Sequence, residues 1–204
     1  MAVRLAVGLL VLLLVTGCRG APGPDAAFQD PGQVPPEIGV LLMPPFGPGD
    51  SLLTGSVPGR PGLWDPVEGQ PVPAFSLSVS DGASMSSEVL SGRALAINFW
   101  ASWCGPCRHE IPLLVERQAE LPEDLLILAV NVRESESKIV EFAAEVGMEL
   151  PIVLDPDGEV SDLFGARGLP TTVFVDPQGN LTATWQGVLD RAKLVQLTDA
   201  SLGR

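Results

Sequence analysis

The chain has 204 residues, with 12 Lys and Arg against 25 Asp and Glu, which gives a formal net charge of −13 at pH 7. This charge argues against nucleic acid and anionic lipid as electrostatic partners, because binding to either depends on basic side chains. Once a leader and a linker are set aside, the length leaves room for one domain with a hydrophobic core. Three cysteines are present, and Cys18 lies far from Cys104 and Cys107.

The first 18 residues have the pattern of a secretory leader. Arg4 precedes the run Leu5 to Val15, which is apolar apart from Gly8. This run is shorter than the ~20 residues of a membrane-spanning helix and suits the apolar region of a signal peptide. Thr16-Gly17-Cys18 resembles the end of the bacterial lipoprotein cleavage box, in which the cysteine is lipidated and becomes the mature N-terminus. We predict a signal peptide over 1–17 and lipidation of Cys18; the alternative is an ordinary signal peptide with an incidental cysteine.

The segment that follows is rich in proline and glycine. Residues 19–70 hold 11 of the 20 prolines and 10 of the 22 glycines. Proline removes backbone donors and glycine raises the entropic cost of order. We therefore predict that 18–70 is a tether without regular structure, spanning roughly 40 Å as a coil or on the order of 160 Å as extended polyproline. Within it, Ile38 to Met43 and Leu63-Trp64 are apolar enough to lie on the domain surface.

From Pro71 onward, the pattern predicts alternating strands and helices. Period-two alternation predicts a half-buried strand at 74–79, and continuous apolar runs predict buried strands at 94–100 and 125–132. The other predicted elements are a short return strand or helical turn at 85–90, helices at 105–121, 134–146, 158–166 and 191–202, a strand at 152–154, and a hairpin of strands 171–175 and 181–186. This order predicts an α/β fold with a mixed central sheet flanked by helices on both faces.

Two cysteines lie where the strand 94–100 ends and the next helix begins. A thiol at Cys104 is close to unpaired backbone N–H groups and to the positive end of the helix dipole, both of which favour the thiolate. Cys107 lies one turn further in, close enough to form a disulfide with Cys104 and less open to solvent. We predict that Cys104 attacks and Cys107 resolves, with Trp103 and Pro106 shaping the exposed surface around Cys104.

Two charged or titratable residues lie near the cysteines on the same predicted helix. Glu110 is three residues after Cys107 and shares its helix face. A partly buried carboxylate there would raise the pKa of Cys107 and exchange a proton with it; the alternative is a solvated glutamate. His109, the single histidine, makes a poor metal site with Cys104 and Cys107, because three ligands at one helix start lack a further donor. We expect His109 to be solvated and predict no metal and no cofactor.

Two motifs resemble those of the thioredoxin family. Phe99-Trp-Ala-Ser-Trp-Cys-Gly-Pro-Cys107 resembles the thioredoxin active site, and Arg167-Gly-Leu-Pro-Thr171 resembles the loop that carries the thioredoxin cis-proline. The resemblance implies a thioredoxin fold over 71–204, with an extra N-terminal hairpin and a strand–helix insertion. It also implies a cis bond before Pro170, which places the backbone of Leu169 beside Cys104 for pairing with a substrate strand.

Within thioredoxins, the chain is similar to the membrane-anchored TlpA/ResA-like branch. The shared features are the N-terminal anchor, the extra hairpin, the insertion at 131–148, the pattern Cys-x-x-Glu-x-Pro after Cys107, and Asn98. Ordinary thioredoxins have an aspartate at the position of Asn98. Since an amide cannot act as a base, proton transfer is left to Glu110 or water.

The resemblance implies three alternative functions. The first is a lipid-anchored, extracytoplasmic reductant of disulfides in exported proteins, of the kind used in cytochrome c maturation or copper-site assembly. The second is a disulfide oxidant or isomerase, and the third a copper-binding assembly factor. Gly105-Pro106 resembles reducing thioredoxins rather than the Pro-His type of strong oxidants, which favours the first. We expect a monomer on a bacterial membrane, recharged by a membrane electron donor because nothing in the sequence binds a nicotinamide.

Overall fold

The structure is a computed structural model that describes residues 52–57, 64–79, 84–90 and 92–204. The predicted signal peptide over 1–17, the predicted lipidation site Cys18 and the apolar segment 38–43 lie outside these residues, so they remain predictions. In the described part of the chain, no helix has both the length and the apolar character needed to cross a membrane.

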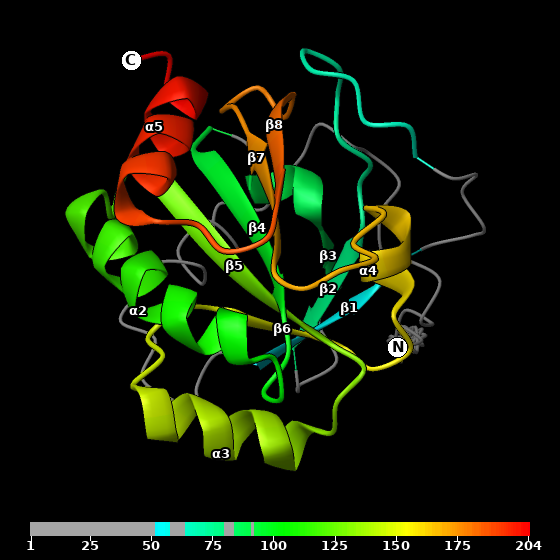
Figure 1. Cartoon of the computed structure of the whole chain (residues 1–204). Helices are drawn as coiled ribbons and strands as arrows, with labels where there is room; N and C mark the ends of the chain where they lie inside the picture. Colours follow the sequence, from blue (N-terminus) through cyan, green and yellow to red (C-terminus); the bar gives the residue numbers. More distant parts are fainter. Residues whose placement is uncertain (1–51, 58–63, 80–83, 91) are drawn as a thin grey trace, which may run out of the picture. The chain divides into compact units, whose positions relative to one another are not determined.

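Within the described residues, eight strands form one mixed sheet in the order β3-β2-β1-β6-β5-β4-β7-β8 (Figure 1). The strands are β1 (Leu52–Ser56), β2 (Ser76–Val79), β3 (Ser84–Ser86), β4 (Ala94–Trp100), β5 (Leu125–Val132), β6 (Ile152–Asp155), β7 (Thr171–Val175) and β8 (Leu181–Gln186). The helices are the 3-10 helix η2 (Ser87–Leu90) and the α-helices α2 (Gly105–Glu120), α3 (Glu136–Val146), α4 (Glu159–Leu163) and α5 (Arg191–Ser201). The predicted fold class is confirmed.

The central strands follow directly from their sequences. β4 and β5 have the predicted bounds, and each of their residues is buried, as continuous apolar runs require. β4 pairs in parallel with β5 and antiparallel with β7, which confirms the predicted closing hairpin of β7 and β8. The segment predicted as strand or helical turn is both, because β3 leads directly into η2. The helix predicted over 158–166 is shorter and covers only α4.

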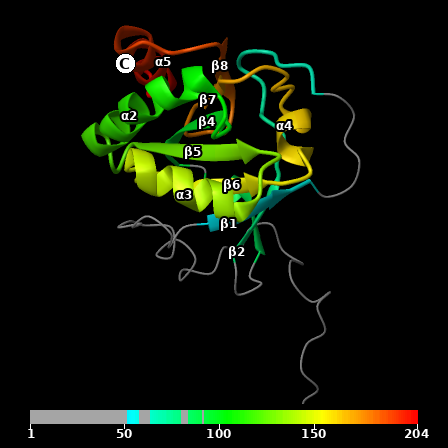
Figure 2. The ribbon, with the colours of Figure 1, turned by 60° about the horizontal axis from the view of Figure 1, so that its bottom comes forward.

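Helices cover both faces of the sheet, and the sheet separates two hydrophobic cores. One core contains Ile111 and Leu114 of α2, Ile139 and Phe142 of α3, and Leu194 of α5. The other core contains Val160 and Leu163 of α4 together with Phe75 and Leu90. Figures 1 and 2 show α2 and α3 on one side of the sheet and α4 at the other. The helix carrying the cysteines is therefore packed over β4 and β5 by its apolar side.

The first strand corrects the predicted tether. β1 lies within residues 18–70, where we predicted no regular structure, yet it pairs antiparallel with β2 and in parallel with β6. The prediction failed because it rested on the composition of the whole segment, while Leu52–Ser56 contains no proline and a single glycine. A Cβ on Gly55 would be 2.8 Å from a methyl group of Val160 and 2.9 Å from one of Val153, so close packing requires glycine there. The folded domain thus includes β1 as well as residues from Pro71.

A second part of the tether also contacts the domain. Trp64 is half-buried and packs edge-to-face on Phe164, with ring centroids 5.3 Å apart. The prediction that this apolar residue lies on the domain surface is confirmed.

The contribution of β1 can be measured with two variants of the same strand. Leu53 is buried in the core under α4, whereas its neighbour Thr54 is exposed. Leu53→Ala is expected to lower the free energy of unfolding by about 2–4 kcal/mol because it leaves a cavity. Thr54→Ala is expected to change it by less than about 0.5 kcal/mol. Urea unfolding measures both, and equal small effects would show that β1 is not part of the folded domain.

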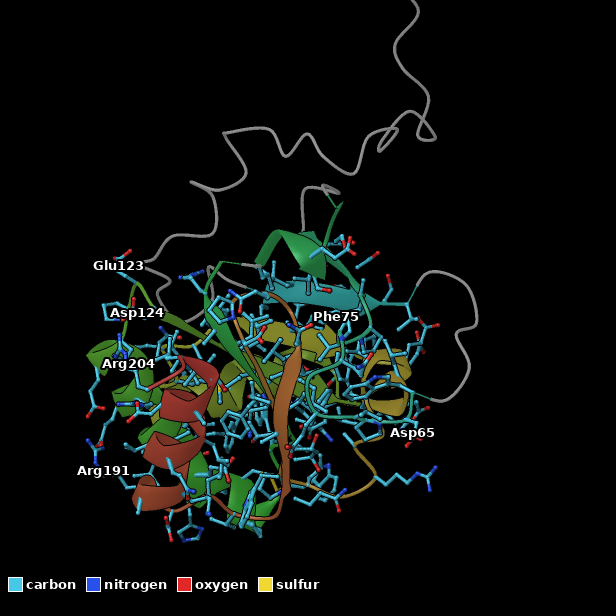
Figure 3. The ribbon with its side chains drawn as sticks, turned by 90° about the horizontal axis from the view of Figure 1, so that it is seen from above. Asp65, Phe75, Glu123, Asp124, Arg191 and Arg204 are labelled. Carbon is cyan, nitrogen blue, oxygen red and sulfur yellow. A yellow bond between two sulfur atoms is a disulfide. The ribbon has the colours of Figure 1, made fainter. Side chains whose placement is uncertain are left out.

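The C-terminal helix is fixed beside the helix that carries the cysteines. Arg117 of α2 is buried and donates from Nε to Thr198 Oγ1 of α5 at 2.9 Å. Arg204 pairs with Asp124 at 2.7 Å, and the two side chains lie next to each other in Figure 3. These contacts fix α5 against the second half of α2 and the turn that follows it.

Candidate active site

The two predicted cysteines form a disulfide at the start of α2. Cys104 and Cys107 are joined with an S–S distance of 2.03 Å, and both are almost fully buried. Cys104 is the N-cap residue of α2, and its Sγ accepts a hydrogen bond from the backbone N–H of Cys107 at 3.2 Å. The sulfur thus lies at the positive end of the helix dipole, where a thiolate is stabilised.

The surface beside the disulfide is formed by the residues between and before the cysteines. Trp103 is 72% exposed, an unusually high value for a tryptophan in a folded domain. Pro106 is also exposed and occupies the first turn of α2, where its missing N–H is no loss. Both residues are therefore available to a partner chain.

The bond between Leu169 and Pro170 is cis, as the thioredoxin resemblance implied. Pro170 is buried and immediately precedes β7, the antiparallel neighbour of β4. Leu169 is half-buried and packs against the hydrophobic cluster that includes Cys104 and Cys107. The role predicted for its backbone in binding a substrate strand remains a prediction.

Glu110 is buried rather than partly buried as predicted, with 1% of its surface exposed. Its Oε1 accepts a hydrogen bond from Asn98 Nδ2 at 2.7 Å, and its Oε2 accepts one from the backbone N–H of Leu189 at 2.7 Å. The alternative of a solvated helix glutamate is therefore wrong. Glu110 lies on the same helix as Cys107. In the disulfide form, its carboxylate is held by hydrogen bonds from β4 and from the connection before α5.

Asn98 links this carboxylate to the strand after the cis-proline. Its Nδ2 donates a second hydrogen bond, to Thr172 Oγ1 at 2.9 Å, so both amide protons are used. Asn98 is a polar residue inside an otherwise apolar strand, a pattern that is typical of a buried side chain with a hydrogen-bond partner. Thr172 and the N–H of Leu189 were missed, because a threonine in a strand and a backbone amide carry no distinguishing sequence signal.

Burial shifts the protonation equilibrium of Glu110 into the neutral range. Removal from water raises the pKa of its carboxyl from 4.5 to about 7, although the hydrogen bonds from Leu189 and Asn98 act in the opposite direction. Near neutral pH, the group is therefore present in both protonated and ionised forms. A group of this kind can accept or donate a proton during a reaction at pH 7.

The same shift predicts that the disulfide form loses stability as pH rises. Because the pKa of Glu110 is about 7 in the folded chain and close to 4.5 in the unfolded chain, the folded state binds more protons between these values. The contribution of Glu110 to the free energy of unfolding is therefore full below pH 4.5 and is lost as the pH rises through 7. We expect Glu110 to lower the free energy of unfolding by on the order of 3 kcal/mol between pH 4.5 and pH 8. Urea unfolding across this range should show the loss in the wild type but not in Glu110→Gln.

A carboxylate that the sequence did not predict contacts the active-site turn. Glu134 follows β5 and accepts hydrogen bonds at 2.6 Å from both the backbone N–H and the Oγ of Ser102. It also accepts one from Asn131 Nδ2 at 2.8 Å. The predicted start of α3 at 134 is accordingly two residues early, since Ser135 is the N-cap.

His109 is exposed, and its Nδ1 lies 2.9 Å from the carbonyl oxygen of Gly105 in its own helix. Among the residues that the structure describes, no three His, Cys, Asp or Glu side chains are grouped as metal ligands.

The sequence matches a known family and several characterised relatives. The AhpC/TSA family matches residues 68–184, more than half of the chain. The thiol–disulfide oxidoreductase ResA of Bacillus subtilis is 29% identical over 157 residues, covering 76% of this chain and 86% of ResA. The thioredoxin-like protein YneN of the same organism is 33% identical over 135 residues, covering 65% of this chain and 79% of YneN.

Solved structures give the same result. A putative thiol:disulfide interchange protein DsbE from Chlorobium tepidum superposes with a TM-score of 0.62 at 30% identity, over 68% of this chain and all of that one. The exposed lipoprotein thioredoxin Etrx1 from Streptococcus pneumoniae superposes with a TM-score of 0.56 at 27% identity, over 63% of this chain and 99% of that one. The chain therefore belongs to the thioredoxin-like AhpC/TSA family, among its thiol–disulfide oxidoreductases of the ResA type.

Proposed function

We propose that the chain is a lipid-anchored, extracytoplasmic thiol–disulfide reductant that acts through Cys104 and Cys107 on exported proteins. The observation that carries the proposal is the Cys104–Cys107 disulfide at the N-terminus of α2, with the buried carboxyl of Glu110 one turn beyond. The leader ending at Cys18 supports the anchor, and the lipoprotein character of the similar thioredoxin Etrx1 agrees with it.

The first step is attack on a partner disulfide. The Cys104 thiolate forms a bond with one partner sulfur, the partner S–S bond breaks, and the other partner sulfur leaves as a thiolate. The result is a mixed disulfide between Cys104 and the partner. The exposed Trp103 and the backbone at Leu169 are the surfaces against which the partner segment lies.

The second step releases the partner. Glu110 accepts the proton of Cys107, whose thiolate attacks the Cys104 sulfur and closes the intramolecular disulfide. The partner sulfur that was bonded to Cys104 leaves as a thiolate and takes up a proton, so two electrons have passed to the partner. A carboxyl with a pKa of about 7 is suited to this transfer at neutral pH. A membrane electron donor then restores the dithiol.

The partners we propose are exported proteins whose cysteines must stay reduced, as in cytochrome c maturation or copper-site assembly. In cells that express the full chain, alkylation of free thiols in acid-quenched cells measures the redox state of the pair. A reductant is expected to be mostly dithiol at steady state; a mostly disulfide pair would instead indicate an oxidant. Loss of membrane association in Cys18→Ser tests the anchor separately.

A further inference from the structure

The turn that presents Cys104 is a short segment between β4 and α2. It is closed by one backbone hydrogen bond, from Cys104 N to the carbonyl oxygen of Ala101 at 3.1 Å. Ser102 lies inside this turn, two residues before the sulfur, and its N–H and hydroxyl are directed to a side chain from another part of the chain. The position of the turn therefore depends on that side chain.

Glu134 holds Ser102 with both carboxylate oxygens. Oε2 accepts from the Ser102 N–H and Oε1 from its hydroxyl, each at 2.6 Å, so the contact resembles a two-pronged clamp. Hydrogen bonds to an ionised acceptor are short and roughly twice as strong as neutral ones. This clamp connects the active-site turn to the start of the β5–α3 connection, 32 residues away.

Arg133, the residue before Glu134, has an uncommon backbone conformation that helps to position the Glu134 carboxylate. Arg133 has a φ of 58°, and among the described residues it is the one non-glycine residue with positive φ. This conformation is uncommon for a residue with a Cβ and costs free energy that other contacts must offset. Arg133 is held by its N–H, which donates to the carbonyl oxygen of Asp155 at 3.0 Å, and by an ion pair with Asp162 at 2.8 Å.

The buried side-chain amide of Asn131 also donates a hydrogen bond to Glu134. Asn131 is fully buried on β5, opposite Trp100 of β4, on the face covered by α2 and α3. Its Nδ2 donates to Glu134 at 2.8 Å, whereas its Oδ1 has no hydrogen-bond partner among the described residues. An apolar side chain would suit this site better, since an unpaired buried polar atom is unfavourable. Unlike an apolar side chain, Asn131 donates a hydrogen bond to Glu134 at this site.

The environment keeps Glu134 ionised. Partial burial alone would raise the pKa of its carboxyl, but the hydrogen bonds from Asn131 and Ser102 outweigh this and hold the pKa below its usual range. The clamp is therefore charged at neutral pH.

We propose that Glu134 is a positioning residue for disulfide exchange, which fixes the turn at Ser102 and thereby holds the Cys104 sulfur within reach of Cys107. The inference rests on the proposed roles of the two cysteines. When the disulfide is open, the covalent restraint between the two sulfurs is gone. The clamp then acts together with the backbone hydrogen bonds from Cys104 N to Ala101 and from Arg108 N to Cys104 to limit the motion of Cys104 relative to α2. A fixed geometry raises the effective concentration of Cys107 toward a Cys104 mixed disulfide.

The test compares variants of the full chain in glutathione redox buffers. Glu134→Gln places an amide donor opposite the donors of Ser102 and Asn131, so at least one hydrogen bond is lost. We expect the equilibrium constant for closing the disulfide to fall about tenfold, which is about 30 mV for a two-electron couple. The rate at which Cys107 displaces glutathione from Cys104 should fall by a similar factor. Glu136→Gln removes an equal charge from an exposed position two residues away and should change neither quantity.

Ser102→Ala provides a second route to the same result. It removes one of the three donors, so we expect a smaller fall, and the double variant should be no worse than Glu134→Gln because both changes act on one contact. An unchanged closing constant in Ser102→Ala and Glu134→Gln would overturn the proposal, as would equal effects of Glu134→Gln and Glu136→Gln. If Glu134→Gln does not fold, Ser102→Ala alone decides. Failure of the wild type to exchange with glutathione at all would instead refute the proposed function.

Discussion

Replacing Cys107 by Ser is expected to convert the protein into a trap for its partners. Cys104 keeps its place at the N-terminus of α2 and can still attack, but the resolving sulfur is absent. Mixed disulfides should therefore accumulate, and turnover of a disulfide substrate should fall by at least about a thousandfold. Cys107 is buried, so the change to the similarly sized serine leaves the surface that a partner meets unaltered. Non-reducing gels of membranes, followed by identification of the trapped proteins, measure the result.

Two control variants separate the role of the attacking sulfur from that of the membrane anchor. Cys104→Ser removes the attacking sulfur and should give neither trapping nor turnover. Cys18→Ser should leave the exchange chemistry intact while releasing the chain from the membrane. If Cys107→Ser traps nothing while the wild type turns over, Cys104 is not the attacking residue.

Replacing Glu110 by Gln is expected to slow resolution about a hundredfold at pH 7, within the range found for general acid–base catalysis. Attack by Cys104 should change by less than about twofold, because Glu110 is directed to Asn98 and Leu189 and not to the surface. Reaction of Cys104 with a small aromatic disulfide measures the first step. Release of glutathione from a Cys104–glutathione mixed disulfide measures the second.

The pH dependence of resolution separates proton transfer from a structural effect. In the wild type, the rate should show an inflection near pH 7, where Glu110 ionises. In Glu110→Gln this inflection should be absent, leaving only the ionisation of Cys107. Glu141→Gln, which removes a charge from an exposed position on α3, serves as the control and should behave as the wild type. Equal slowing of both steps in Glu110→Gln would refute the assigned role.

The parts of the fold that the sequence predicts well are those with a local cause. β4 and β5 are runs of buried residues that are apolar except for Asn98 and Asn131, and their bounds were predicted to the residue. The start of α2 at Gly105 follows from the Cys-Gly-Pro-Cys sequence, because Pro106 suits a first helical turn. The cis bond before Pro170 came from the family resemblance alone, since few X–Pro bonds are cis.

The parts that were missed depend on contacts between distant residues. Glu110 accepts a hydrogen bond from an amide 79 residues away, and Glu134 accepts one from a residue 32 positions earlier. Neither the periodicity of apolar residues nor the spacing of motifs indicates that residues so far apart in the sequence are hydrogen-bonded. β1 was missed for a different reason, because a five-residue strand was averaged with the prolines around it. Its parallel pairing with β6 joins segments that lie far apart in the sequence, and its own residues carry no signal for it.

The central claim, that electrons flow from this protein to its partners, is tested most directly by the reduction potential of the Cys104–Cys107 couple. The measurement needs a soluble form that begins at residue 19, so that β1 is retained, equilibrated against glutathione or a stronger dithiol. We predict a potential near or below about −250 mV, as in reducing thioredoxins. A potential near about −120 mV would mark a disulfide donor and would contradict the proposed direction of electron flow.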